Sequence, residues 1–186
     1  DKHQVGGLIV FNFSESLNTI SGGSALANLP SRNMGLSGRA TYGYDDRYFV
    51  EANFGYNGSE KFAENNRYGF FPSAGGGWII SNESFFANTF PSISLLKLKY
   101  TYGLVGNDNI AAASDRFFYL SDVSLNDGGR GYAWGEDYGN YYNGYNINRY
   151  SNPNVTWEVA KKTNYGLELE LMNALVIQVD YFTEKR

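Results

Sequence analysis

Apolar and polar residues alternate along much of this chain, so that every second side chain points to the same side. In the stretch YFVEANFGYNG (48–58), the even positions from Tyr48 to Tyr56 are apolar, whereas the odd positions include Glu51 and Asn53. A period of two indicates a β-strand with two chemically different faces. Such runs recur at about seven places. They lie near residues 5–13, 35–44, 48–58, 71–80, 96–106, 164–171 and 177–181, and the first is apolar on both faces.

The links between these runs alternate between short and long. Residues 45–47 and 172–174 form very short links, and the link around 81–94 is moderate. Long links are expected at 14–33, 57–69 and 107–155. Strands of about ten residues joined in turn by short turns and long loops are typical of outer-membrane barrels. In a soluble sandwich, a structureless loop as long as the third would count against the strand assignment.

A soluble antiparallel sheet remains an alternative, because its buried face also produces alternation. Tyrosines such as Tyr42, Tyr56 and Tyr102 lie near strand ends on the apolar side. An interfacial aromatic girdle sits at such positions, whereas a soluble core would have to satisfy each buried hydroxyl. The opposite side carries charged residues suited to a watery lumen. The pattern therefore predicts an all-β chain and leaves two settings open, a soluble sheet and a transmembrane barrel.

Composition supports the all-β prediction and excludes several functions. The 186 residues include 22 Gly, 16 Tyr and 13 Phe but only 4 Pro, which favours strands and turns. A net charge of −4 gives no reason to expect nucleic acid as a partner. The chain has no cysteine, and its one histidine, His3, has no partner nearby in sequence. We therefore expect no catalytic residue, no metal site and no cofactor.

The chain also lacks the sequence signals of a helical membrane protein. No stretch approaches the roughly 18 consecutive apolar residues of a transmembrane helix, and residues 1–13 do not resemble a signal peptide. The mean hydropathy of −0.41 is compatible with a barrel, whose lipid face takes only every second residue. Because the chain begins within a strand pattern, we expect it to be a piece of a longer protein.

Several ordered segments resemble the SusC/RagA group of TonB-dependent outer-membrane transporters of Bacteroidetes. Together they cover well over half of the chain, and residues 14–35 and 109–151 fall outside them, as expected of variable external loops. The segments are LSGRATYGYDDRYFVEANFGYNGSEKF (36–62), RYGFFPSAGGGWIISNESFF (67–86), LLKLKYTYGLVGND (95–108), NPNVTWEVAKKTNYGLELEL (152–171) and VDYFTEKR (179–186).

The resemblance implies that residues 1–186 form part of the transmembrane β-barrel domain, with antiparallel up-and-down strands and long extracellular loops. Family members are barrels of roughly 22 strands with a plugged lumen. The plug, the TonB-contacting segment and both barrel ends would therefore be absent. The implied function is import of an oligosaccharide, or in some members a peptide, across the cell outer membrane. A SusD-like surface lipoprotein and the TonB complex would be its partners.

In such a barrel, one side of each strand faces the lumen and the other faces outer-membrane lipid. The residues expected to face the lumen are Arg39, Glu51, Lys97, Lys99, Glu168 and Glu170. The residues expected to face lipid are Val50, Phe54, Tyr56, Leu98, Tyr100, Leu167 and Leu169.

The third long loop contains the segment GGRGYAWGEDYGNYYNGYNINRY (128–150), which is dense in Tyr, Gly and Asn. Aromatic faces beside polar groups can bind a sugar ring. Such residues are also enriched at protein interfaces, so packing within the loop or against the lipoprotein is the alternative. The candidates for ligand binding are Trp134, Asp137, Tyr138, Tyr141, Tyr142 and Arg149.

Two other functions compete with transport. A soluble or surface-exposed β-sheet module could bind carbohydrate through the aromatic loop without transport. A glycan-degrading enzyme would need two carboxyl groups at a defined separation, and the adjacent Glu136 and Asp137 do not supply that geometry. The apolar side of residues 48–56 distinguishes the two: it would face lipid in a membrane barrel and a protein core in a soluble module.

Overall fold

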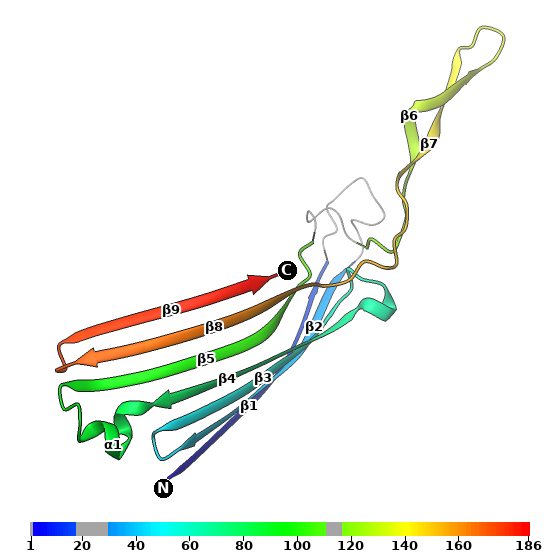
Figure 1. Ribbon diagram of the computed structural model, residues 1–186. Coiled ribbons are helices and arrows are strands. Elements are labelled where there is room, and N and C mark those ends of the chain that lie inside the picture. Colours follow the sequence, from blue (N-terminus) through cyan, green and yellow to red (C-terminus); the bar gives the residue numbers. More distant parts are fainter. Residues whose placement is uncertain (1, 18–29, 111–116) are drawn as a thin grey trace.

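The computed structural model describes residues 2–17, 30–110 and 117–186, which form one broad sheet and a separate hairpin (Figure 1). The broad sheet has seven strands in the order β1-β2-β3-β4-β5-β8-β9, and β6 pairs with β7. All pairs are antiparallel. The predicted all-β antiparallel sheet is thus confirmed. The strands are β1 (His3–Ser16), β2 (Ser31–Tyr44), β3 (Tyr48–Ser59), β4 (Tyr68–Ile79), β5 (Ile93–Asn107), β6 (Asp122–Trp134), β7 (Asn140–Arg149), β8 (Glu158–Leu171) and β9 (Leu175–Lys185).

The strand registers keep the sequence alternation in phase across the sheet. Tyr48 lies opposite Trp78, Trp78 opposite Leu98, and Leu98 opposite Leu167. Because directly opposed residues project to the same side, the apolar positions share one face of the sheet. We call this side the apolar face and the other, which carries the charged residues, the polar face.

Register also fixes the orientation of β1, whose own pattern is ambiguous. Val5 lies opposite Tyr42, and Leu8 lies opposite Arg39. Val5 therefore belongs to the apolar face and Leu8 to the polar face. Pairing with β2 therefore decides which side of β1 belongs to the apolar face and which to the polar face.

The apolar face is the more exposed of the two. On β3, Val50 is 57% exposed and Tyr56 42%, whereas Glu51 and Asn53 between them are half-buried. Among the described residues, the buried apolar side chains are Phe62, Phe117 and Ala160. A soluble sheet buries its apolar face in a core, so this distribution is the reverse of a soluble sheet.

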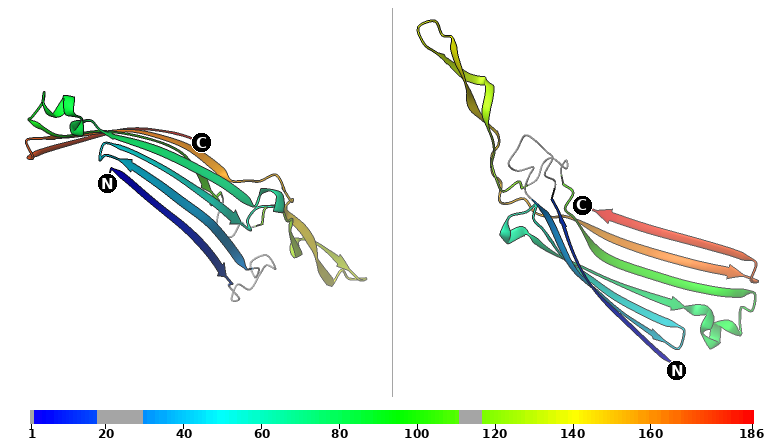
Figure 2. Two further views of the ribbon diagram at one scale, coloured as in Figure 1. Left: turned by 90° about the horizontal axis from the view of Figure 1, so that it is seen from below. Right: turned by 180° about the vertical axis from the view of Figure 1, so that it is seen from behind.

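Short and long connections lie at opposite ends of the sheet, as predicted (Figure 2). At the short-turn end, Asp45 and Asp46, and likewise Met172 and Asn173, have φ angles of 50–55°, which gives tight hairpin turns. The connection from β4 to β5 also lies there and contains η2 (Ile80–Asn82) and α1 (Ser84–Ala87). No helix in the described part of the chain is long and apolar enough to cross a membrane.

The long-loop end carries the other connections. η1 (Glu64–Asn66) lies between β3 and β4, and most of the loop predicted at 14–33 lies outside the described residues. The connection from β5 to β8, predicted as one long loop, contains the β6–β7 hairpin. This hairpin extends away from the broad sheet (Figures 1 and 2). Its register shifts between Ser124 and Asp127 and again before Tyr132, so the sequence shows no steady alternation there.

Candidate functional site

Charged side chains on the polar face pair across neighbouring strands. Lys99 Nζ lies 2.5 Å from Glu168 Oε1, and Lys97 Nζ lies 3.9 Å from Glu168 Oε2. Arg39 Nε lies 3.3 Å from Glu51 Oε1. The polar face therefore carries a series of compensated charges rather than a patch of one sign.

The polar face also forms a shallow groove of about 970 Å³ that reaches from β1 to β9. Gly75, Gly77 and Gly103 contribute to its lining beside the lysines, and Glu170 lies on the same face two residues beyond Glu168. All six residues predicted to face the lumen thus share one side of the sheet. That this side lines a lumen stays a prediction.

The seven residues predicted to face lipid share the apolar face in the same way. Stacked aromatic pairs lie at both ends of this face. Tyr48 and Trp78 lie at the short-turn end, with ring centroids 6.3 Å apart, and Tyr56 and Tyr68 lie toward the long-loop end, 5.3 Å apart. An apolar band between two aromatic girdles is the outer surface of a membrane barrel.

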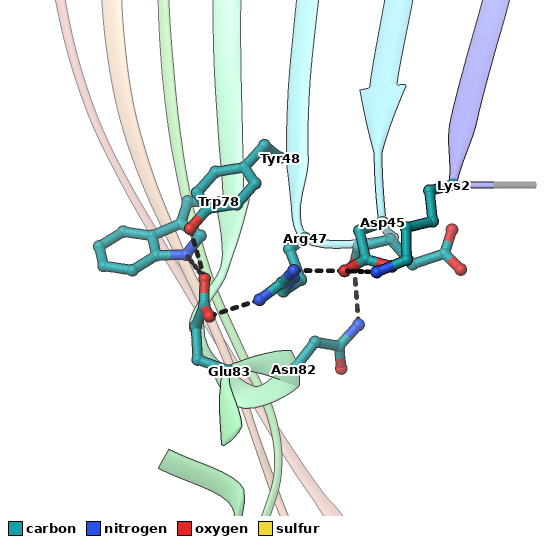
Figure 3. Close-up of polar contacts among 8 residues, drawn as sticks. Lys2, Asp45, Arg47, Tyr48, Trp78, Asn82 and Glu83 are labelled. Atoms are coloured by element: carbon teal, nitrogen blue, oxygen red, sulfur yellow. Dashed lines mark hydrogen bonds and ion pairs between the residues drawn. The ribbon is translucent and has the colours of Figure 1, made fainter. Parts of the chain in front are cut away.

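A buried carboxylate anchors the β4–β5 connection at the short-turn end (Figure 3). Glu83 is 7% exposed and accepts hydrogen bonds from Tyr48 Oη at 2.6 Å and Trp78 Nε1 at 3.2 Å. Arg47 donates to its other oxygen at 2.8 Å and also pairs with Asp45. We call these contacts the Glu83 clamp. It joins the turn before β3 and the beginning of β3 to the end of β4 and the connection that follows it, and sequence reasoning missed it.

Two further contacts hold the same end together. Asn82 Nδ2 donates to the backbone oxygen of Asp46 at 2.7 Å, and Lys2 Nζ lies 3.5 Å from Asp45 (Figure 3). The turn at 45–47 is therefore held both by η2 and by the residue that precedes β1.

The hydrogen bond from Tyr48, followed by those from Trp78 and Arg47, lowers the pKa of Glu83 below its ordinary value of 4.5, although burial opposes the shift. A carboxyl group whose folded-state pKa is lowered stabilises the fold above its unfolded pKa. This contribution is lost as the pH falls through the folded-state pKa. The clamp is thus fully formed at neutral pH and weakens only in acid.

Replacing Glu83 with glutamine is expected to loosen residues 80–92 at neutral pH, because the neutral amide loses the charged contact with Arg47. Hydrogen exchange of this segment, corrected for intrinsic rates, should be several-fold faster in Glu83→Gln at about pH 7. The unmodified protein should approach the variant as the pH falls through the lowered pKa of Glu83. The matched control Asn82→Ala removes a neutral hydrogen bond and should keep the pH dependence. Equal protection in Glu83→Gln and the unmodified protein would contradict the clamp.

A small aromatic core lies at the long-loop end. Phe62 is 1% exposed and packs on Trp157, with ring centroids 5.3 Å apart, and Phe71 contacts Trp157 at 5.2 Å. Trp157 Nε1 donates to the backbone oxygen of Arg67 at 3.3 Å. This core joins the β3–β4 connection to the segment that enters β8, and it supports the base of the long loops.

The β6–β7 hairpin separates the aromatic candidates onto two sides. Trp134 lies opposite Asn140 and Tyr132 lies opposite Tyr142, so these four residues share one side. We call it the hairpin aromatic face. The rings of Tyr132 and Trp134 lie 5.2 Å apart, and Trp134 is 61% and Tyr142 65% exposed. Tyr141 lies opposite Ala133, between these two pairs, and so belongs to the other side of the hairpin.

The remaining loop candidates do not gather at this face. Asp137 and Tyr138 lie in the turn between β6 and β7, and Tyr138 has a φ of 53°. Tyr141 donates to the backbone oxygen of Gly128 at 2.5 Å. Arg149 lies opposite Asp122 in the strand register at the base of the hairpin, and its Cζ atom lies 4.7 Å from the centroid of the Phe118 ring. The six candidates therefore do not form one site.

Within the described ranges, no group of three or more His, Asp or Glu residues could hold a metal ion. Polar groups of the described residues are instead used in cross-strand pairs and in anchoring turns.

Comparisons with known proteins agree with this geometry. No protein-family model matches the chain. A TonB-dependent receptor of Formosa agariphila is 31% identical over 150 residues, which covers 80% of this chain and 14% of that receptor. TonB-dependent receptor SusC of Bacteroides thetaiotaomicron is 32% identical over 141 residues, which covers 75% of this chain and 13% of SusC.

Among solved structures, the RagAB peptide transporter matches 99% of this chain and 22% of its own chain, with a TM-score of 0.74 and 24% identity. The RagAB peptide importer in its open-open state matches with a TM-score of 0.73 and 23% identity. At this level of identity the likeness shows the fold alone.

The fold and its two faces define a wall segment of an outer-membrane β-barrel, although the seven strands do not themselves close. Sequence similarity over most of the chain identifies the family. The chain belongs to the TonB-dependent receptors and is a segment of a SusC/RagA-type member, spanning 13–14% of the length of these curated relatives. TonB-dependent receptors are non-enzymatic proteins of the outer membrane. This finding sets aside both the soluble carbohydrate-binding module and the glycan-degrading enzyme.

Proposed function

We propose that this chain is part of the barrel wall of a nutrient importer that takes up an oligosaccharide with energy from the TonB complex. Residues 1–186 would belong to the barrel domain, and the plug and the TonB-contacting segment would lie elsewhere in the receptor. The observation that carries the proposal is the two-faced sheet in a chain of this family. An exposed apolar face suits lipid, and a polar face of paired charges suits a watery lumen.

The β6–β7 hairpin supports a partner above the barrel. A two-stranded hairpin is marginally stable by itself in water, yet this one extends beyond the broad sheet (Figure 1). Contact with another protein would supply the missing support. In this proposal, a SusD-like surface lipoprotein rests on the long-loop end and contacts the hairpin.

The hairpin aromatic face supports an oligosaccharide as the substrate. Exposed rings of Tyr132, Trp134 and Tyr142 offer apolar surface for the CH groups of a sugar, and Asn140 adds a side-chain amide on the same side of the hairpin. The RagAB structures are those of a peptide transporter. A peptide is therefore the alternative substrate to compare with an oligosaccharide.

The test uses the complete receptor with its lipoprotein partner and compares the double variant Trp134→Ala/Tyr142→Ala with Tyr150→Ala. Tyr150 is 75% exposed but lies beyond the end of β7, outside the hairpin aromatic face. If each ring contributes about 1 kcal/mol, the double variant should bind oligosaccharides roughly 30-fold more weakly, measured by calorimetry. Tyr150→Ala should bind as the unmodified receptor does.

Three results would change the proposal in different ways. Uptake of peptides but not oligosaccharides would overturn the substrate and leave the importer intact. Loss of lipoprotein binding in the double variant, with sugar binding unchanged, would assign the hairpin aromatic face to the partner. Uptake that continues without the TonB complex would overturn TonB-dependent import itself.

A further inference from the structure

Three consecutive glycines, Gly75, Gly76 and Gly77, lie near the end of β4, where they weaken a strand. Gly75 is on the polar face, and a Cβ there would lie 2.9 Å from Thr101 Cγ2, so crowding accounts for this glycine. Gly76 is on the apolar face. The nearest atom to a Cβ built there is the backbone oxygen of Phe49 at 3.7 Å, an ordinary contact. The neighbouring atoms therefore leave space for a side chain at position 76, and because this residue is glycine, no side chain fills that space.

The space over Gly76 is part of a depression of about 630 Å³ on the apolar face, crossing β3, β4, β5, β8 and β9. Aromatic rings form two walls. The stacked Tyr48 and Trp78 form the first, and Tyr100 and Tyr165, with centroids 5.0 Å apart, stand in the second. Aliphatic side chains such as Leu98 complete the lining.

No charged side chain points into this depression in the described part of the chain. Lys99 contributes to its lining only from the backbone side, because its ammonium group lies on the polar face, 2.5 Å from Glu168. A water molecule needs two to four polar partners to remain in a cavity, and this lining is nearly all carbon. Hydrocarbon is the content that fits, because a methylene chain packs against carbon and needs no polar partner.

The first wall is held in place before any ligand arrives. The Glu83 clamp accepts hydrogen bonds from Tyr48 and Trp78, so both rings point their polar atoms toward the short-turn end. Gly76 pairs with Val50, two residues into β3, which is about 7 Å from the beginning of the strand. The depression thus lies just inside the apolar band, next to the aromatic girdle, where lipid chains begin.

We infer that this depression is a binding site for one acyl chain of a phospholipid in the membrane leaflet at the short-turn end. The site is continuous with the membrane-facing surface of the barrel wall. Its shape and its fixed aromatic wall distinguish it from the surrounding apolar face. The inference is independent of the imported substrate and of the lipoprotein partner.

The test is photo-crosslinking of the complete receptor in nanodiscs of dioleoyl phosphatidylcholine doped with a phosphatidylethanolamine that carries a diazirine in one acyl chain. Mass spectrometry of the digested receptor locates the adducts. In the unmodified receptor, adducts should concentrate on residues 76–78 and 98–100 relative to the rest of the apolar face. In Gly76→Leu, which fills the depression, labelling of these peptides should fall about fivefold.

Ala40→Leu is the matched control, because it adds the same side chain to an exposed position of the apolar face outside the depression. Its labelling should equal that of the unmodified receptor. Uniform labelling of the apolar face, or undiminished labelling in Gly76→Leu, would overturn the site. If Gly76→Leu does not assemble, Val50→Phe fills the same space from β3 and gives the same readout.

Discussion

Replacing Phe54 with arginine is expected to reduce the amount of folded receptor in the outer membrane by more than roughly tenfold. Phe54 lies near the middle of β3 on the apolar face, 6.1 Å from Phe70 between ring centroids. It also covers Gly38, where a Cβ would lie 2.4 Å from the Phe54 ring. An arginine facing lipid at mid-depth costs about 2–4 kcal/mol, in addition to the lost packing. Membrane fractionation and heat-modifiable gel mobility of the complete receptor measure the effect.

The matched control places the same charge on the other face. Thr41→Arg lies on the polar face directly opposite Glu51 and should assemble normally. Asn53→Ser, next to Phe54 in sequence but on the polar face, should also be tolerated. If Phe54→Arg and Thr41→Arg assemble equally well, the assignment of the apolar face to lipid is wrong.

Replacing Phe62 with alanine is expected to open the long-loop end without dismantling the barrel. Phe62 is 1% exposed and packs on Trp157, so the substitution leaves a cavity that costs about 3–5 kcal/mol. The aromatic core is local, and the strand ladder does not depend on it. Hydrogen exchange at 59–68 and 155–159 should therefore accelerate at least about a hundredfold, whereas exchange within residues 48–57 of β3 stays unchanged.

Phe85→Ala serves as the comparison for this experiment, because Phe85 is 62% exposed at the opposite end of the sheet. It should leave exchange at 59–68 unaltered. A uniform acceleration across β3 in Phe62→Ala would show that the core supports the barrel wall rather than the loop base.

The seven strands could be predicted from sequence because alternation is a local property that survives wherever register is regular. The residues of the apolar and polar faces could also be predicted from this alternation, because neighbouring strands such as β3 and β4 pair without a bulge. The β6–β7 hairpin escaped prediction because its register shifts three times, which breaks the period of two. Its aromatic residues were recognised, but their division between two sides depends on pairing that the sequence does not display.

The Glu83 clamp and the Phe62–Trp157 core could not be predicted, because each depends on contacts between distant segments. Phe62 and Trp157 are brought together only when β3 and β8 take their places in the sheet. One local signal did exist for the clamp. Glu83 is the single charged residue between positions 79 and 96, and an isolated carboxylate in an apolar stretch requires a partner.

The pairing of charges on the polar face determines how a solute is attracted to this wall. Opposite charges as close as Lys99 and Glu168 act on a distant ion as a dipole, whose field falls off much faster than that of a single charge. Salt screens what remains within about 10 Å. A cargo molecule moving past these strands would therefore experience little long-range steering from them. Its selection here would depend on contacts made at hydrogen-bonding distance, in which stereochemistry counts for more than net charge.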